Sequence, residues 1–313
     1  MHVPPRALRV DTHETGMRLD VLLAAKLDLS RAQIRRLLAR GAVCVSGRSV
    51  GLAAKGERLA AGTAIEVAPF TRPEHQRIPT EPERPLEVLA EGSGWVALDK
   101  PAGIPVHPLK EGETGTLLGA LCARRPELDG VGEGGLASGV VHRLDVDTSG
   151  ALLVATEQPA WERLRSAFKE HRVEKVYRAI VHGHPEGAGS VEVGLVTARH
   201  RPARVRVVED EERSRARGVR MAALRWQVLE SFDAFSLVEV RPRTGHLHQI
   251  RVTLAHLGTP IAGDATYGPR EDRSAAPRQM LHAAQVGFAE IEASSPDPAD
   301  FAQQLEGLRG LAR

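Results

Sequence analysis

The chain contains 313 residues, of which 42% are hydrophobic and 26% charged, and its formal net charge is +2. This composition is that of an ordinary globular protein able to bury a core, and the length favours two domains. No apolar run reaches the roughly 18 residues of a membrane span and the first residues lack an apolar signal core, so we expect a cytoplasmic protein with no membrane segment.

Residues 1–69 predict a small basic module, which opens with two helices. Leucines at helical spacing indicate the first helix, over residues 17–27. The second helix follows Ser30, whose side chain can form a capping box with Gln33, and it ends at Gly41. The two helices should pack their leucines together.

The rest of this module predicts a small sheet. Residues 43–50 alternate around a Ser-Gly turn and predict a hairpin, and residues 64–67 predict a further strand. Between Arg31 and Arg58, seven Lys and Arg residues stand against a single acid. A locally basic module on a nearly neutral chain suggests a polyanion partner.

In its order of helix, helix and hairpin, the segment 18–67 resembles the alpha-L RNA-binding module first known from a small-subunit ribosomal protein. The resemblance implies RNA phosphate contacts by the arginines of the second helix, namely Arg31, Arg35, Arg36 and Arg40. Such contacts hold an RNA in place without reading its sequence. The alternative is an ordinary solvated basic helix face.

Four prolines among charged residues predict a linker over residues 70–85, because proline resists both helix and interior strand. A second domain should then occupy residues 86–313. Its first strands are expected at 86–89 and 95–98, joined by a turn. Farther on, eight arginines within residues 199–220 predict a long hairpin.

The chemistry centres on residues 139–156, which read GVVHRLDVDTSGALLVAT. A polar knot over residues 142–149 lies between two apolar runs, a short entry at 140–141 and a second run at 151–155, and each run predicts a buried strand. We expect the knot to form a loop at a sheet edge, where rigid strands can aim its side chains. Its candidates for a site are His142, Arg143, Asp145, Asp147 and Thr148.

Several further segments, together with this stretch, resemble the RluA-type family of pseudouridine synthases. That family shows a Lys-Pro-x-Gly loop, an HRLD-x-x-TSG stretch, a Lys-x-Tyr strand, TG-x-x-HQIR and GD-x-x-YG. The matching positions here are residues 100–103, 142–150, 175–177, 244–251 and 256–268, with a late Leu-His-Ala strand at 279–288. The resemblance covers about residues 86–290.

The resemblance implies an α+β fold, in which the basic helix–hairpin module precedes a catalytic domain with a mixed, mostly antiparallel sheet and flanking helices. It implies Asp145 as nucleophile, Arg251 as its partner and Tyr177 packed on the uracil. Substrate contacts are expected from Arg143, which would fill the gap left by a flipped uridine, and from the remaining candidates His142, Thr148 and Lys100. By analogy it favours large-subunit ribosomal RNA as target, and we expect a monomer.

The reaction itself is consistent with this set of side chains. Making pseudouridine breaks the ribose bond to uracil nitrogen, turns the base and joins ribose to carbon 5, with no redox change, so we expect neither cofactor nor metal. One carboxylate is sufficient, provided that it is ionised, and a guanidinium such as Arg251 favours that form. Cys44 and Cys122 lack metal-type spacing.

Each key residue has a plainer interpretation: Asp145 as a turn residue, Arg251 as a strand residue with an exposed head and Tyr177 as a half-buried strand residue. Departures from the family pattern stand beside the key positions, at Val146, His246, Thr253 and Leu224.

Three alternatives remain open. One is a synthase acting on transfer RNA, and another is a non-catalytic RNA-binding protein on the same scaffold. The third is a metal hydrolase using His142, Asp145, His246 and His248, since two histidines two apart on a strand would point to one side.

Overall fold

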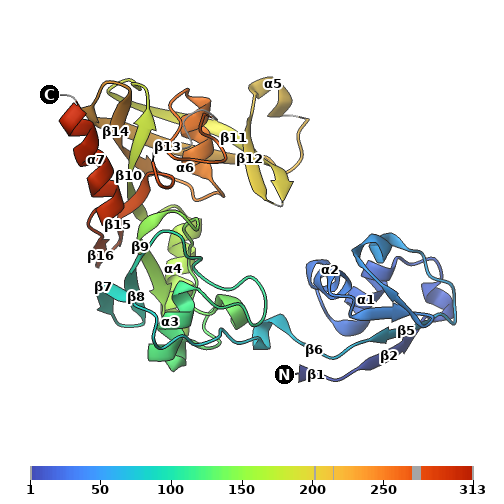
Figure 1. Cartoon of the computed structure of the whole chain (residues 1–313). Helices are drawn as coiled ribbons and strands as arrows, with labels where there is room; N and C mark the ends of the chain where they lie inside the picture. Colours follow the sequence, from blue (N-terminus) through green and yellow to red (C-terminus); the bar gives the residue numbers. More distant parts are fainter. Residues whose placement is uncertain (1, 201, 214, 270–275, 312–313) are drawn as a thin grey trace. The chain divides into compact units, whose positions relative to one another are not determined.

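The computed structural model describes residues 2–200, 202–213, 215–269 and 276–311. The chain divides into two compact units, Met1–Arg77 and Ile78–Arg313 (Figure 1). Among the described residues, no helix has the length and apolar character that crossing a membrane requires.

The first unit contains the two predicted helices and the predicted hairpin. Its elements are β1 (His2–Val3), β2 (Arg6–Arg9), η1 (Thr12–Glu14), α1 (Leu19–Leu27), α2 (Arg31–Ala39), β3 (Val43–Val45), β4 (Arg48–Val50), η2 (Leu52–Gly56), β5 (Ala64–Val67), β6 (Phe70–Thr71) and η3 (Pro73–His75). The capping box is confirmed, because Ser30 Oγ accepts from Gln33 N and the Gln33 side chain accepts from Ser30 N. Strands run in the order β2-β5-β3-β4, all antiparallel.

Residues 70–85, the predicted linker, are divided between the two units. Strand β6 pairs with β1, and Arg72 donates to the carbonyls of Leu27 and Asp28. Ile78 is buried in the core of the second unit, and the Glu81 carboxylate accepts from two backbone N–H groups there. Proline prevents regular interior structure, but it does not prevent an extended segment from docking on its neighbours.

The second unit is built on one ten-stranded sheet. Its strands are β7 (Glu87–Gly92), β8 (Trp95–Lys100), β9 (Ser149–Ala155), β10 (Glu174–His182), β11 (Ala188–His200), β12 (Ala203–Val208), β13 (Arg220–Ser231), β14 (Phe235–Pro242), β15 (Leu281–Phe288) and β16 (Ile291–Ser294). Its helices are α3 (Leu117–Arg124), α4 (Gln158–Lys169), α5 (Asp210–Arg213), α6 (Gln249–His256) and α7 (Ala299–Leu311), with 3-10 turns η4 (Pro126–Leu128) and η5 (Gly135–Ala137).

The strand order is β12-β11-β13-β14-β10-β15-β9-β8-β7, with β16 added to β15. The β9–β15 pair is parallel and the other pairs in this sheet are antiparallel. The predicted α+β class and mostly antiparallel sheet are confirmed. The arginine-rich stretch is only partly a hairpin: β11 and β12 form one, whereas α5 and the start of β13 follow it, and Arg201 and Ser214 lie outside the described residues.

Strand β9 is covered on both of its faces. Ala151, Leu153 and Ala155 pack in one cluster with α4, whereas Leu152 and Val154 pack in another with α3, as the period-two geometry of a strand requires. All seven of its residues are buried. The strand therefore gives the loop that precedes it a rigid base.

Gly150 explains how β9 can approach β15 so closely. Its φ is +115°, and a Cβ atom at this position would lie 2.2 Å from the Ala283 carbonyl oxygen. A side chain would thus collide with backbone and would also be strained. Glycine is required where the polar loop enters the sheet.

Candidate active site

A cleft of about 780 Å³ opens in the second unit. It is lined by the loop before β9, by α4, by β10 and by the residues that lead into α6. Of the predicted site residues it contains His142, Arg143, Asp145, Thr148, Tyr177 and Arg251. Residues far apart in the sequence therefore meet in one hollow, as the family resemblance implied.

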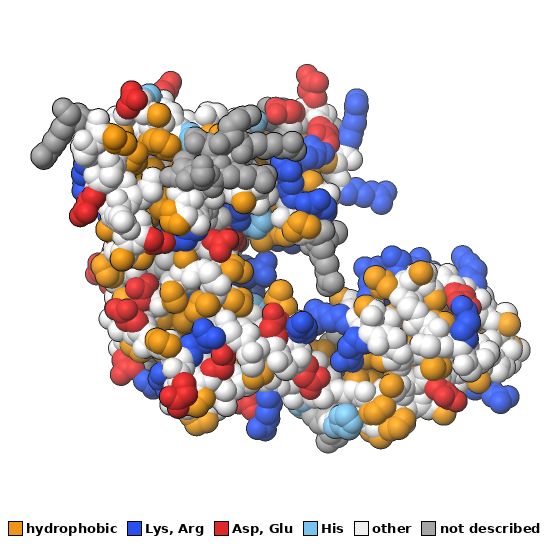
Figure 2. Space-filling model, in the orientation of Figure 1, with side chains coloured by type: hydrophobic (Ala, Val, Ile, Leu, Met, Phe, Trp, Pro, Cys, Tyr) orange, Lys and Arg blue, Asp and Glu red, His pale blue; other side chains and the backbone are white. Residues whose placement is uncertain are grey.

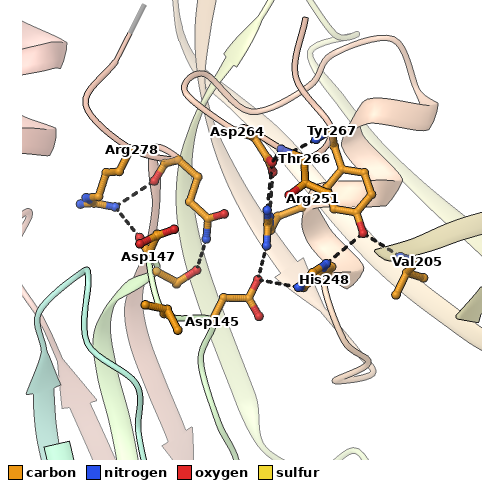
Figure 3. A network of polar contacts seen from close by, with 12 residues as sticks. Asp145, Asp147, Val205, His248, Arg251, Asp264, Thr266, Tyr267 and Arg278 are labelled. Carbon is orange, nitrogen blue, oxygen red and sulfur yellow. Dashed lines mark hydrogen bonds and ion pairs between the residues drawn. The ribbon is translucent and has the colours of Figure 1, made fainter. Parts of the chain in front are cut away.

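Asp145 and Arg251 form an ion pair in this cleft (Figure 3). Arg251 Nη1 donates to Asp145 Oδ2 at 2.8 Å. The other side of the guanidinium binds Asp264, with Nε to Oδ2 at 2.7 Å and Nη2 to Oδ1 at 2.9 Å. Arg251 is thus held between two carboxylates, one buried and one that lines the cleft.

The electrostatics of this group depend on burial and on paired charge. Burial raises the pKa of the Asp264 carboxyl, but the hydrogen bonds and charge of Arg251, with the N–H groups of Thr266 and Tyr267, outweigh it and leave the pKa below its ordinary value. Burial lowers the pKa of Arg251, and the two carboxylates more than offset this and raise it. The guanidinium therefore stays charged beside Asp145.

The loop that carries Asp145 is held by two residues just before β15, Arg278 and Gln279. Gln279 Nε2 donates to Thr148 Oγ1 at 2.7 Å. Arg278 Nη1 donates to the Asp147 carbonyl at 3.1 Å, and its Nη2 donates to Ser149 Oγ at 3.1 Å. Because Thr148 is only 2% exposed, its hydroxyl serves the loop, although the residue lines the cleft.

Lys100 does not take the substrate-binding place expected of it. It is fully buried, it does not line the cleft, and its ammonium donates at 2.8 Å to three carbonyls, those of Pro101, Ile104 and Val146. Burial lowers its pKa to about 8. A lysine with three carbonyl acceptors can satisfy all its donors inside the protein. It ties the Lys-Pro-x-Gly loop to the residue that follows Asp145.

Tyr177 and Lys175 reach the cleft from β10. Burial, and after it the charge of Asp145, raises the pKa of the Tyr177 phenol. The phenol therefore stays protonated and offers the cleft a flat aromatic face and an O–H group. Lys175 Nζ donates to the Thr244 carbonyl at 2.9 Å, and burial lowers its pKa to about 8.

His142 and Arg143 stand at different depths. His142 Nε2 accepts from the Leu153 N–H at 2.9 Å, and its ring stacks on Phe168 with centroids 4.5 Å apart. Burial lowers its pKa to about 3, so the ring is neutral. Arg143 is exposed at the cleft, where its side chain is free to meet a ligand.

The metal-hydrolase alternative fails on geometry. Residues 246–248 are not a strand: α6 begins directly after His248, which has φ +53°. His246 Nε2 lies 2.9 Å from the Met221 carbonyl and His248 Nδ1 lies 2.9 Å from the Tyr267 hydroxyl. With His142 bound to backbone, the ring nitrogens do not converge on one point with Asp145. The prediction of paired histidines on a strand was wrong.

The side chains that hold Asp145 and Arg251 in place were not predicted. Asp264, Tyr267 and Gln279 lie in stretches that match the family pattern, and Arg278 directly precedes one, but the pattern assigns no role to them. A second carboxylate beside Arg251 could have been expected, because a buried guanidinium has five N–H donors and needs more acceptors than Asp145 alone provides. The sequence did not say which carboxylate would supply them.

The arginines of α2 belong to the first unit and differ among themselves. Arg31 binds the fully buried Asp20 at 2.9 Å, so part of its role is structural. Burial raises the pKa of Asp20, and hydrogen bonds from Arg31 and Arg18 lower it by more. Arg35, Arg36 and Arg40 are exposed, and within the described ranges none of them forms an ion pair. Figure 2 shows Lys and Arg side chains gathered on the face of this unit that carries α2.

Two family models match the chain. The model described as RNA pseudouridylate synthase matches residues 94–256, and the S4 domain model matches residues 17–54. A protein of Chloroflexus aurantiacus named as an uncharacterized RNA pseudouridine synthase is 38% identical over 98% of this chain and 95% of its own length. A Zymomonas mobilis protein named ribosomal large subunit pseudouridine synthase D is 34% identical over 97% of this chain and 95% of its own.

Solved structures agree with the sequence relatives. Human RNA pseudouridylate synthase domain containing 1 is 26% identical, with a TM-score of 0.57, and the match covers 74% of this chain and 97% of the human one. The family resemblance read from the sequence is therefore confirmed over the catalytic unit and the basic module. The chain belongs to the RluA-type RNA pseudouridine synthases, isomerases of uridine in RNA, and carries an S4 RNA-binding domain before its catalytic unit.

Proposed function

We propose that this protein converts uridine to pseudouridine in large-subunit ribosomal RNA, with Asp145 as the nucleophile. The observation that carries the proposal is the Asp145 carboxylate in the cleft, paired through one oxygen with a buried Arg251 and sharing the hollow with Tyr177. A charged carboxylate held by a fixed guanidinium is a side chain prepared to act on an electrophilic sugar carbon.

The two carboxylate oxygens of Asp145 have different tasks in this proposal. The contacts of its side chain go to Oδ2, and within the described residues Oδ1 has no hydrogen-bond partner. Oδ1 would act at ribose C1′ while the C1′–N1 bond breaks and its electron pair leaves with uracil. After the base turns, carbon 5 bonds to C1′ and Asp145 is released. Carbon 5 then gives up its proton to water and N1 takes one up, so no atom is gained or lost overall.

The other residues of the cleft would hold the extruded nucleotide. Tyr177 would stack on uracil, because its protonated phenol combines a flat face with a polar tip. Arg143 would occupy the space that the base leaves in the RNA, offsetting part of the few kcal/mol that extrusion costs. His142 Nε2 and Thr148 Oγ1 already accept from the Leu153 N–H and Gln279 Nε2, so these residues would offer the RNA the His142 ring with its Nδ1–H and the hydroxyl hydrogen of Thr148.

The RNA would be held by both units. Arg35 and Arg36 would contact phosphate from α2 and Arg40 from its C-terminal cap, and Arg31 would do so with the part of its side chain that remains exposed. The choice of large-subunit ribosomal RNA rests on relatives whose names state that target, from Zymomonas mobilis and Neisseria meningitidis. From this target we propose that the protein acts in the cytoplasm, and that it does so as a monomer.

Release of tritium from carbon-5-labelled uridine tests this function directly. Purified protein should release tritium from a large-subunit ribosomal RNA transcript and should release little from a transfer RNA pool. Release from transfer RNA alone would correct the target. Absence of release from either RNA, in a protein that still binds RNA, would favour the non-catalytic alternative. Mapping pseudouridines in RNA from a strain that lacks the gene would identify the modified position.

A further inference from the structure

A chain of polar groups leads from strand β12 to the catalytic carboxylate (Figure 3). The Val205 N–H donates to the Tyr267 hydroxyl oxygen at 2.9 Å. The same hydroxyl lies 2.9 Å from His248 Nδ1, and His248 Nε2 lies 4.0 Å from Asp145 Oδ2. The proposed function makes no use of either His248 or Tyr267.

One arrangement of protons gives every group in this chain a partner. A backbone N–H can only donate, so the Tyr267 oxygen accepts from Val205, and in this arrangement its hydroxyl hydrogen points to His248 Nδ1. A neutral imidazole carries one proton, which is then on Nε2, the atom that faces Asp145. The opposite tautomer would turn a lone pair of Nε2 toward a carboxylate.

The surroundings keep His248 neutral. Its side chain is 12% exposed, and burial lowers its pKa, a shift that the charges of Asp145 and Asp264 oppose and those of Arg251 and Arg143 reinforce. Protonation would also require a hydrogen on Nδ1, where the Tyr267 hydroxyl already donates. The Tyr267 ring is itself fixed, since the Arg251 and Arg204 guanidinium carbons lie 5.3 and 5.9 Å from its centroid.

We propose that His248 is a positioning residue for Asp145, held by Tyr267 in the tautomer that presents Nε2–H to Asp145 Oδ2. Arg251 and His248 then face the same oxygen, and Oδ1 is left for the sugar. The separation of 4.0 Å is longer than a hydrogen bond, and we expect it to shorten when RNA fills the cleft, as catalytic contacts commonly do. The inference rests on the proposed role of Asp145.

Two replacements of His248 distinguish the effect of its N–H donor from the effect of its side-chain volume. His248→Gln keeps an N–H at about the place of Nε2, whereas His248→Phe keeps a ring and removes the donor. Both carry the same strain at φ +53°, so their difference reports the donor. His256→Gln, on the exposed end of the same helix, is the matched control.

Single-turnover isomerisation at saturating RNA is the first measurement. Losing a hydrogen bond to a charged group corresponds to about a 10- to 100-fold slower step, which we expect for His248→Phe, with RNA affinity unchanged. His248→Gln should recover most of the rate, and His256→Gln should match the unaltered protein. Equal rates in the Phe and Gln variants would overturn the proposal.

Nitrogen-15 NMR of the histidine side chains gives a readout that a purely structural role would not move. The His248 signal, assigned by its loss in His248→Gln, should show a neutral ring with its proton on Nε2. Tyr267→Phe should mix the tautomers and slow isomerisation without weakening RNA binding. A proton on Nδ1 in the unaltered protein would refute the inference even if His248→Phe fails to fold.

The roles of Asp145 and of His248 can be refuted separately. If Asp145→Asn isomerises uridine normally, the proposed nucleophile is wrong. If that variant is inactive while both His248 variants and Tyr267→Phe are fully active, only the positioning role is wrong.

Discussion

Arg251 lies between two carboxylates, and we expect their replacement to affect different properties. Replacing Asp264 should lower stability, whereas replacing Asp145 should abolish activity. Asp264 is fully buried and makes two hydrogen bonds to the guanidinium, whereas the Asp145 side chain is 23% exposed and makes one. Asp264→Asn removes the charge that balances a buried guanidinium and turns an amide N–H group toward it. Breaking a buried pair of this kind costs about 3–5 kcal/mol.

We expect Asp264→Asn to fall near the lower end, at about 3 kcal/mol, because its remaining oxygen can still accept from the Thr266 and Tyr267 N–H groups. For a unit of this size that corresponds to a Tm lower by about 6–12 °C. Asp145→Asn leaves Arg251 paired with Asp264, so its cost should stay below about 1 kcal/mol. Its isomerase activity should nevertheless be lost.

Thermal unfolding and tritium release on the same preparations measure the two effects. RNA binding should survive in Asp145→Asn, which separates lost chemistry from lost substrate. Two results would contradict the different roles of the carboxylates: a loss of several kcal/mol of stability in Asp145→Asn, or an unchanged Tm in Asp264→Asn. Turnover by Asp145→Asn at a rate near that of the unaltered protein would contradict its role as nucleophile.

Three further outcomes are expected. Because the pKa of Asp264 is lowered in the folded protein, its carboxylate stabilises the fold above its ordinary pKa of about 4, and this stabilisation is lost as pH falls through the lower folded value. The difference in free energy of unfolding between the unaltered protein and Asp264→Asn should therefore disappear in strong acid, and a difference independent of pH would contradict the ion pair. Arg35→Glu with Arg36→Glu should weaken RNA binding and reduce the slope of log K against log salt by at least about 1.4, which binding titrations at several salt concentrations would show; an unchanged slope would count against phosphate contacts by α2. Gly150→Ala places a methyl group against the Ala283 carbonyl and should cost several kcal/mol or prevent folding, and a soluble variant of normal Tm would show that β9 and β15 are farther apart than described.

Local patterns were sufficient for elements whose signals are short-range. The capping box at Ser30, the β3–β4 hairpin and the buried strand after the polar knot could all be read from neighbouring residues. The first part of that stretch was misread, because Val140 makes only an isolated bridge to Val154. Two valines are too few to distinguish a strand from two apolar residues in a loop.

What the patterns could not give is how distant loops fold back on one another. Asp145 and Arg251 are 106 positions apart, and only the family resemblance joined them. For the same reason the burial of Lys100 could not be predicted. A lysine between an acidic residue and a proline is expected to face solvent, and only the folded structure shows that three carbonyls from two loops surround it. The same limit also affected residues 246–248, where alternation suggested a strand but the chain forms the turn that leads into α6.

The boundary between Arg77 and Ile78 decides where a shortened enzyme should start. A fragment cut at residue 86, where the prolines end, would lose the apolar side chain of Ile78 and strip the Gly115 and Thr116 amides of their shared acceptor, Glu81. Those amides lie at the entrance to α3, which backs β9. Removing these eight residues would thus weaken the packing of α3 on β9, the strand that follows the Asp145 loop. Slow turnover by such a fragment would therefore not show that the RNA-binding domain is required.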